Sequence, residues 1–406
     1  MSLDITAVRR QFPALGGDWV YFDNAGGSQT LQRVPERIAE CLLTHNVQLG
    51  ASYAESRQAG ERLLAARRRM AFFMNAARPE EIVMGPTTTA LLRNLAQAMA
   101  SQLAPGDEII VSNTDHEVNI SPWLELEKQG VRVKFWRYHP DTLALELDDL
   151  QGLLGERTRL VTVTHASNIL GAVNPVADIA RLVHARGARV CIDGVAYAPH
   201  RLIDVQDWDV DYYVFSCYKV YGPHHAVMYG KYDHLLALDS LYHRFVGKDK
   251  VPNKLEPGNC NYELAHGAAA TVDYLEELGA QCGGGPGRAA LATAFQAIAE
   301  HEQTIGERLL AYLRGKNSVR IIGPSQGDRA LRVPTISFVL EGRDSADIAQ
   351  RIDPHRIGIR YGDFYSCRLV DDLGLRPRNG VVRVSMVHYN TTDEVDRLIR
   401  RLDEVI

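Results

Sequence analysis

The sequence predicts an α/β fold in two parts, a large domain around a mostly parallel sheet followed by a smaller α+β domain. The first observation is that short β-rich runs alternate with helical patterns from about residue 80 to residue 230. Such alternation is typical of a parallel sheet that carries helices on both faces. The second observation is that the alternation ends after about residue 275, where a long helical stretch precedes widely separated strands.

Five β-rich runs define the predicted parallel sheet. They are residues 108–112, 131–135, 160–164, 189–193 and 212–215. The stretch 176–186 between two of them has apolar residues at helical spacing, which predicts a covering helix. Ligands of such sheets bind at the carboxyl ends of the strands, where Thr164, Asp193 and Ser216 fall.

The C-terminal part begins after the glycine-rich run 282–287. This run follows a helical pattern and lacks the Lys-Ser/Thr of a P-loop, so a linker is expected and not a phosphate loop. A helix from Arg288 to about Arg314, strands at 335–340 and 381–386, and a terminal amphipathic helix are predicted after it. We expect residues 21–282 to form the large domain, 283–406 the small domain, and 1–20 a segment packed on the small domain.

Composition and charge narrow the functional classes. The chain has 406 residues, 46% hydrophobic and 23% charged, with a formal net charge of −5. This balance gives no reason to expect nucleic acid or an anionic membrane as a partner. No apolar run approaches the ~20 residues of a membrane span, and the N-terminus lacks the apolar core of a signal peptide. We therefore expect a cytoplasmic enzyme.

Cysteine and glycine patterns exclude two further classes. The six cysteines show no C-x-x-C and no paired spacing, and the fourteen histidines form no H-E-x-x-H. These patterns indicate reduced thiols and no metal site. No predicted strand is followed by G-x-G-x-x-G, which argues against a nicotinamide dehydrogenase.

Lys219 and Asp193 are the two residues that indicate a function most clearly. Lys219 follows the apolar run 212–215 and precedes Gly222-Pro223, and Asp193 ends the run 189–193. A desolvated lysine is nucleophilic enough to form a Schiff base with an aldehyde cofactor. A carboxylate at a neighbouring strand end can keep the pyridinium nitrogen of pyridoxal phosphate (PLP) protonated. Either residue alone favours an ordinary turn, whereas the two together favour PLP.

Four further positions fit such a site, each with an ordinary alternative. The run Thr87-Thr88-Thr89 before a predicted helix suits a phosphate or a plain N-cap. His116 can stack on a flat ring, and Asn168 can donate to a phenolate oxygen. Arg383, within a predicted strand, suits either a substrate carboxylate or an internal ion pair.

The chain resembles fold-type I PLP enzymes of the class V aminotransferase group, close to the cysteine desulfurases. The resemblance runs from about residue 21 to residue 395. It is carried by an ordered set of motifs, namely Asp23-Asn24-Ala25, the threonine run, Asp115-His116, Asn119 to Trp123, Ser167-Asn168, Asp193-Gly194, Pro199-His200, Ser216, Lys219, Arg383 and Tyr389-Asn390. It implies a seven-stranded sheet and a homodimer whose two copies share active sites.

The resemblance also implies a role for individual residues. Lys219 would be the Schiff-base lysine, Asp193 the pyridinium partner, and His116 the ring-stacking catalytic histidine. The phosphate would be held by Thr87, Thr88 and Ser216, together with Asn259 from the partner copy. Arg383, Ala25 and Asn168 would bind the substrate, and Asn168 would also meet the ring hydroxyl.

Three departures from the desulfurase pattern affect the expected reaction. Tyr218 stands where a histidine usually precedes the lysine, and Ala196, beside Tyr197, stands where a glutamine usually meets the ring hydroxyl. The position of the sulfur-accepting cysteine falls on Tyr365, and the nearest thiol is Cys367, two residues later. Because a persulfide nucleophile must reach the substrate sulfur closely, Cys367 is interpreted as a structural or incidental thiol.

We therefore expect an enzyme that binds a small α-amino acid through a Schiff base with PLP. The desulfurase-like frame without its cysteine favours cleavage of a C–S bond, with transamination as the alternative. True desulfuration, racemisation and a non-catalytic role are weaker hypotheses. The intact set of Lys219, Asp193, His116 and Arg383 argues against the non-catalytic role.

Overall fold

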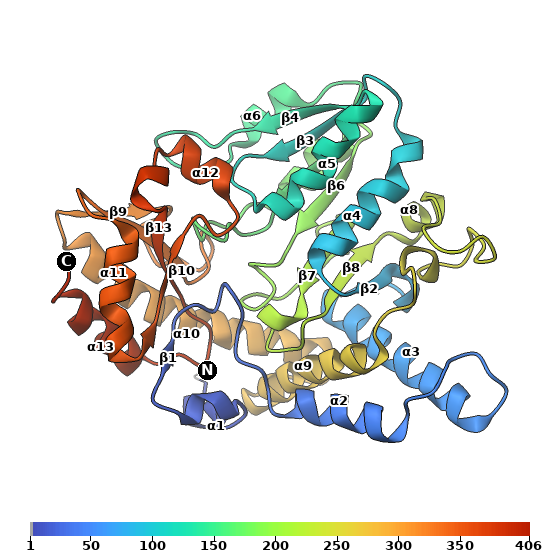
Figure 1. Ribbon diagram of the computed structural model, residues 1–406, viewed down its shortest axis with the longest axis horizontal. Coiled ribbons are helices and arrows are strands. Elements are labelled where there is room, and N and C mark those ends of the chain that lie inside the picture. The colour runs from blue at the N-terminus through green and yellow to red at the C-terminus, as the bar shows by residue number, and fades with distance from the viewer. Residues whose placement is uncertain (1–2) are drawn as a thin grey trace.

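Residues 3–406 are described by the computed structural model, which confirms the predicted α/β class (Figure 1). A seven-stranded sheet has the order β2-β8-β7-β6-β5-β3-β4. Its strands are β2 (Ile82–Gly85), β3 (Glu108–Ser112), β4 (Arg132–Trp136), β5 (Thr158–Thr164), β6 (Arg189–Asp193), β7 (Tyr212–Ser216) and β8 (Ala226–Gly230). Strand β8 is antiparallel to both β7 and β2, and the remaining pairs are parallel.

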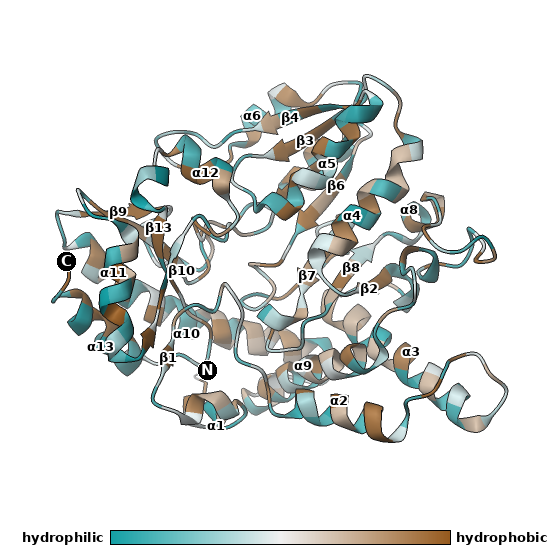
Figure 2. Cartoon of the chain, in the orientation of Figure 1, coloured by the Kyte–Doolittle hydropathy of each residue, from teal (hydrophilic) through white to brown (hydrophobic). Residues whose placement is uncertain are grey.

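Helices cover both faces of this sheet. They are α2 (Arg33–Thr44), α3 (Ala54–Met74), α4 (Thr88–Met99), α5 (Ser121–Leu124), α6 (Leu147–Leu153), α7 (Val176–His184), α8 (Tyr232–Ala237) and α9 (Tyr262–Gln281). Side chains of α3, α7 and α9 share one buried cluster with one face of the sheet, and those of α4 and α5 share a second cluster with the other face. The apolar centre of β3, brown in Figure 2, fits this two-sided burial.

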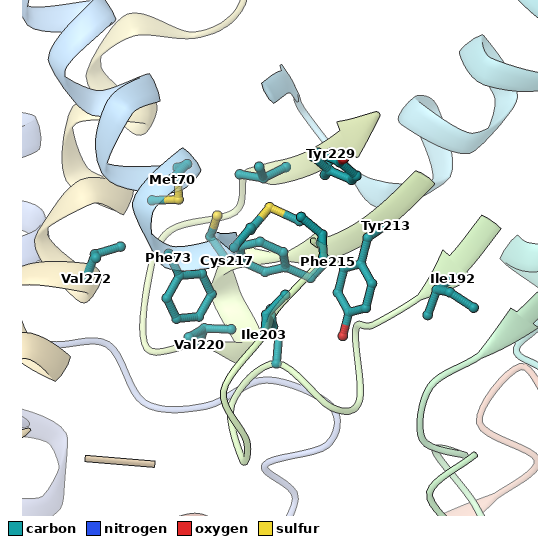
Figure 3. Close-up of a cluster of buried hydrophobic side chains, with 14 of the residues drawn as sticks. Met70, Phe73, Ile192, Ile203, Tyr213, Phe215, Cys217, Val220, Tyr229 and Val272 are labelled. Atoms are coloured by element: carbon teal, nitrogen blue, oxygen red, sulfur yellow. The ribbon is translucent and has the colours of Figure 1, made fainter. Parts of the chain in front are cut away.

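The core beneath β7 fixes the strand that leads to Lys219. Phe73 of α3 and Phe215 of β7 lie with ring centroids 5.5 Å apart, and both are buried. Figure 3 shows them among Met70, Cys217 and Val220. Burying one such ring stabilises the fold by about 1.5–3 kcal/mol, so this packing holds the end of β7 in one position.

The C-terminal part forms a second sheet with the order β12-β13-β10-β9. Its strands are β9 (Val319–Ile322), β10 (Thr335–Leu340), β12 (Arg360–Gly362) and β13 (Val381–Ser385), all paired antiparallel. With it are α11 (Ser345–Ile352), α12 (Cys367–Asp372) and α13 (Thr392–Leu402). Figure 1 shows this sheet, α11 and α13 together at one end of the molecule. The predicted terminal helix buries Val395, Leu398 and Leu402.

Helix α10 (Arg288–Arg314) connects the two parts. Its first half, with Leu291 and Phe295, belongs to the core of the large sheet, and its second half, with Ile305 and Leu309, belongs to the core of the small sheet. The glycine-rich run 282–287 lies between α9 and α10, as expected for a linker. Because α10 contributes to both cores, the boundary at residues 282–283 stays a prediction.

The N-terminal segment contacts both parts of the molecule. It contains α1 (Ile5–Arg9) and β1 (Val20–Tyr21), and β1 pairs in parallel with β11 (Ile357–Gly358). The Arg9 guanidinium donates to Glu394 of α13 at 2.8 Å. Phe12 is buried in the cluster of the large sheet, so this segment also contacts the large domain. The assignment of residues 1–20 to packing with the small domain stays a prediction. Among residues 3–406 no helix has the length and apolar character needed to cross a membrane.

Candidate active site

A cavity of about 340 Å³ opens at the carboxyl ends of β5, β6 and β7. This is the edge at which the sequence places Thr164, Asp193 and Ser216, and all three line the cavity. Seven of the predicted site residues lie in its wall, namely Thr87, Thr88, His116, Asn168, Asp193, Ser216 and Lys219. Arg383, Ala25 and Asn259 are not part of the wall.

Lys219 ends a single 3₁₀ turn (Cys217–Lys219) directly after β7. Its side chain is buried. Burial, and after it the positive charge of Arg383, lowers the pKa of the Lys219 amine to about 8, while Asp193 and Asp23 oppose this change. A lowered pKa supplies unprotonated amine near neutral pH, which is the form that attacks a carbonyl.

Asp193 is the last residue of β6 and is also buried. The backbone N–H of Val195 donates to Asp193 Oδ1 at 2.9 Å, which fixes the carboxylate at the cavity wall. Burial raises the pKa of Asp193 to about 6, and Lys219 counteracts this. Gly194 is required after it, because a Cβ there would lie 2.1 Å from the ring of Tyr213.

His116 is positioned by a buried polar network that begins at its neighbour Asp115. The Asn119 amide donates to Asp115 Oδ2 at 2.6 Å, and Thr162 Oγ1 donates to Asn119 Oδ1 at 2.6 Å. The backbone N–H of Val118 donates to His116 Nδ1 at 3.0 Å. Burial, and then the charge of Lys219, lowers the pKa of His116 to about 4, so its imidazole is neutral at pH 7.

Hydroxyl groups gather at the start of α4. Thr87 is the N-cap and accepts the backbone N–H of Ala90 at 3.0 Å, so the N-cap alternative holds for this side chain. Thr88 Oγ1 lies 2.6 Å from Ser216 Oγ. Two hydroxyls beside a helix N-terminus form a site for a phosphate group.

Asn168 connects the cavity to the loop after β12. Its amide Nδ2 donates to the Phe364 carbonyl at 2.9 Å, and its Oδ1 accepts from Ser366 Oγ at 2.8 Å. The same loop carries Tyr365, whose ring centroid lies 5.2 Å from that of His116 and whose side chain is exposed. Both hydrogen-bonding ends of the Asn168 amide are therefore engaged by this loop, and its role toward a ring hydroxyl stays a prediction.

Arg383 lies beside the cavity in an ion pair. Its Nη2 donates to Asp23 Oδ1 at 2.9 Å, its Nη1 donates to the Asn168 carbonyl at 3.2 Å, and its Cζ lies 3.7 Å from the centroid of the Phe364 ring. The internal ion pair that the sequence left open is therefore present. The backbone N–H of Ala25, nearby, donates to Ser385 Oγ at 2.8 Å.

Asn259 lies away from the cavity of its own chain. Its Oδ1 accepts the Tyr242 hydroxyl at 3.1 Å, and it is exposed in a loop that precedes α9. Its predicted role depends on a second copy of the chain and stays a prediction.

The cavity also contains a residue that the sequence did not indicate. His224 lines it, and the His224 ring stacks on Tyr218 with centroids 4.8 Å apart. Thr89, the last residue of the threonine run expected at a phosphate, lines the cavity as well. Nothing local in the sequence distinguishes His224 from its buried neighbour His225.

Comparison with known proteins agrees with this geometry. The class V aminotransferase family matches residues 20–398, and the chain belongs to it. The chain is 43% identical over its whole length to the aminotransferase-like protein FGM3 of Gibberella zeae, covering 99% of that protein. It is 34% identical, also over its whole length, to the cysteine desulfurase-like protein UstD of Aspergillus flavus, covering 91% of it.

A solved structure extends the likeness to three dimensions. The cysteine desulfurase CsdA of Escherichia coli superposes with a TM-score of 0.86 at 26% identity, covering 100% of this chain and 98% of CsdA. Enzymes of this family and fold depend on PLP. The predicted fold type I and the predicted cofactor are therefore confirmed.

The residues present fit this cofactor. The hydroxyls of Thr88 and Ser216 and the start of α4 suit its phosphate, and buried Lys219 suits its aldehyde. The carboxylate of Asp193 suits the ring nitrogen, and neutral His116 presents a flat ring at the same cavity. These groups face one cavity from two strands, a helix start and two turns, so one ring-shaped ligand can contact them together.

The pKa of Lys219 leads to a testable pH dependence. We expect the rate at which the cofactor-free protein takes up PLP to rise with pH up to about 8 and then to level off, because the amine is mostly unprotonated above its pKa of about 8. An unperturbed lysine would let the rate climb toward pH ~10.4. Stopped-flow absorbance after mixing with PLP measures this, and a rate still rising tenfold between pH 9 and pH 10 would contradict it.

Proposed function

We propose that this protein is a PLP-dependent lyase that cleaves a bond at the β-carbon of a small α-amino acid, in the first instance the C–S bond of a sulfur amino acid. The observation that carries the proposal is the position of Lys219, whose buried amine lies at one cavity with Asp193 and His116, while no cysteine among residues 3–406 lines that cavity. The desulfurase-like frame supports chemistry at the β-carbon, and a cavity wall without a described cysteine supports release of the sulfur over its transfer to the protein.

Each residue has a separate task in this proposal. Bound PLP supplies an electron sink that stabilises negative charge at the substrate α-carbon. Lys219 would hold the aldehyde of the cofactor, and its unprotonated amine would remove the α-proton of the substrate. Asp193 keeps the ring nitrogen protonated, and Arg383 orients the substrate by its carboxylate.

The leaving group needs a proton when the C–S bond breaks. The sulfur departs with the bonding electron pair, and the remaining 2-aminoacrylate is hydrolysed to pyruvate and ammonia. For L-cysteine the balance is one water consumed and pyruvate, ammonia and hydrogen sulfide released. The ammonium of Lys219, which carries the proton taken from the α-carbon, would donate that proton to the departing sulfur.

Transamination is the second candidate. It requires the same binding of amine and carboxylate but breaks no bond at the β-carbon: the substrate would leave as a 2-oxo acid and its amino group would stay with the cofactor. The match to the class V aminotransferase family favours it, as does the name of the relative FGM3. We also propose a homodimer in which Asn259 of one copy reaches the phosphate of the other.

The deciding experiment is an absorbance titration of the PLP-loaded protein with L-cysteine, L-cystine and L-alanine. A spectral change with a sulfur amino acid, together with pyruvate formation, supports the lyase. Conversion of the cofactor to the pyridoxamine form without pyruvate from cysteine would replace it by an aminotransferase. Absence of any visible band after addition of PLP would contradict both.

Cys367 gives a prediction that separates this proposal from a desulfurase. Its thiol donates to Glu117 Oε2 at 3.6 Å and does not line the cavity. Burial, and then the Glu117 charge, raises the pKa of Cys367, so thiolate is scarce at neutral pH. We expect Cys367→Ala to keep turnover within about twofold, as should the remote control Cys41→Ala. A loss of about 100-fold, equal to about 2.7 kcal/mol of barrier, would restore the desulfurase hypothesis.

A further inference from the structure

Arg383 is paired with a carboxylate of its own chain. Its guanidinium is almost fully buried, and Asp23 Oδ1 lies 2.9 Å from Nη2. The carboxylate of Asp23 lies directly behind the cavity wall, since a Cβ on the wall residue Gly26 would be 3.0 Å from Asp23 Oδ2. A carboxylate that belongs to the chain therefore holds the group assigned to the substrate carboxylate.

Arg360 provides a second cationic partner for the same carboxylate. Arg360 of β12 and Arg383 of β13 are direct cross-strand partners. Like charges at such positions repel each other. Asp23 Oδ2 lies 3.6 Å from Arg360 Nη1, so the carboxylate sits between the two guanidinium groups. Two arginines thus share one carboxylate, and one positive charge is left uncompensated within this trio.

The two arginines differ in how freely they can change partners. Arg383 is held from one side by the ring of Phe364 at 3.7 Å and by the Asn168 carbonyl, and its side chain is 2% exposed. Asp23 is 34% exposed and Arg360 is 54% exposed. The side chain of Arg383 is therefore fixed in place, whereas the side chains of Asp23 and Arg360 are partly exposed and have room to rotate.

We propose that Asp23 is a displaceable counter-ion, which neutralises Arg383 in the substrate-free protein and moves to Arg360 when the α-carboxylate of the amino acid takes its place. The inference rests on the proposed function, because it requires an α-amino acid whose carboxylate binds Arg383. The affinity of Arg383 for the substrate carboxylate would then depend on competition between the substrate and Asp23. Arg360 would pair with the Asp23 carboxylate once the substrate has displaced it.

Competition makes two predictions of opposite sign. Removing the charge of Asp23 frees Arg383 and should strengthen carboxylate binding. Removing the charge of Arg360 leaves Asp23 without a second partner, so the carboxylate stays on Arg383 and substrate binding should weaken. A purely structural role for Asp23 in holding Arg383 would instead weaken binding when Asp23 loses its charge.

The test is calorimetric titration of the PLP-loaded protein with L-alanine and with ethylamine, which lacks the carboxylate. We expect Asp23→Asn to lower the dissociation constant for L-alanine about tenfold, or about 1.4 kcal/mol, and Arg360→Gln to raise it about threefold. Ethylamine binding should stay unchanged in both variants. In the double variant Arg360→Gln should add nothing, since the competitor is already absent.

The matched control is Asp18→Asn. Asp18 forms a similar exposed pair with Arg356 between the N-terminal and C-terminal segments, but it lies outside the cavity wall. Its variant should bind L-alanine as the unmodified protein does. If Asp23→Asn binds L-alanine more weakly than the unmodified protein, the inference is wrong while the proposed function stands.

Two other outcomes are equally decisive. An unmodified protein that binds neither compound overturns the proposed function together with the inference. Should Asp23→Asn fail to fold, the exposed position of Arg360 keeps the test available, and an unchanged L-alanine affinity in Arg360→Gln then overturns the inference.

Discussion

The Lys219→Ala variant is expected to lose the visible absorbance band of the lysine-bound cofactor and at least about 10⁴-fold in turnover, or about 5.4 kcal/mol of barrier. Lys219 is buried at the cavity, and its pKa of about 8 makes it the amine there that can bind the aldehyde and later accept a proton. An absorbance spectrum after PLP addition and a turnover assay on the same sample measure both effects.

Lys231→Ala is the matched control. Lys231 directly follows β8, the neighbour of β7 in the sheet, but β8 runs antiparallel to β7. Its ammonium therefore lies at the opposite edge, where it donates to Asp209 Oδ1 at 2.6 Å. This variant should keep the band. A band that survives in Lys219→Ala would show that another group binds the aldehyde and would remove the basis of the proposed function.

The sequence was sufficient to predict the positions of the strands that end at the cavity. The five predicted runs correspond to β3 to β7 within two residues at each end. Strands β3, β5, β6 and β7 are buried on both faces, so their apolar runs are nearly continuous and polar residues mark where they end, whereas the edge strand β4 is only partly buried. Asp193 and Ser216 could be predicted for that reason, because each is the polar residue at the end of an apolar strand, and Lys219 lies in the turn that directly follows Ser216.

The two strands at one edge of the sheet were not found from local pattern. Strand β2 has only four residues, and β8 contains small residues at both ends, Ala226 and Gly230. Their pairing, Ile82 with Tyr229 and Val83 with Met228, joins positions far apart in the chain. Short strands gain their stability from such tertiary pairing, and β-propensity alone does not identify them.

The hydrogen-bonding and ion-pair partners of Arg383 and Asn168 could not be predicted from the local sequence either. Asp23 and Arg383 are separated by 360 positions, and the Asn168 amide meets Phe364 and Ser366 across the two parts of the molecule. The sequence showed that Arg383 needed a carboxylate but not which one. By contrast, the N-cap at Thr87 depends only on residues within one helical turn, and both of its possible roles were visible from the sequence.

The second large effect is expected for Asp193→Asn, which should lower turnover at least about 1,000-fold, or about 4 kcal/mol of barrier, while PLP binding persists through Lys219. The amide keeps the size of the side chain and the bond from the Val195 N–H to its oxygen. It carries no charge, so it cannot hold the proton on the ring nitrogen, and negative charge at the substrate α-carbon loses its electron sink.

The pKa of Asp193 adds a second signature to this variant. Burial raises that pKa to about 6 in the protein without cofactor, and a cationic ring nitrogen in contact would lower it again. The carboxylate is charged above its pKa, so turnover of the unmodified enzyme should fall on the acid side at or below about pH 6. Asn does not titrate, and the residual turnover of Asp193→Asn should lack this decline.

Asp211→Asn is the control for Asp193→Asn. It removes a buried carboxylate elsewhere in the sheet and leaves the carboxylate of Asp193 in place. Asp211 precedes β7 at the opposite edge of the sheet, is buried, and accepts the Val190 N–H at 2.7 Å and His184 Nε2 at 2.8 Å. Its variant should unfold more easily because those groups lose a charged partner, yet the folded fraction should turn over normally. If instead Asp193→Asn kept full turnover with the same acid decline, the ring nitrogen would have to be held by another acid, and the assignment of Asp193 would fail while that of Lys219 stood.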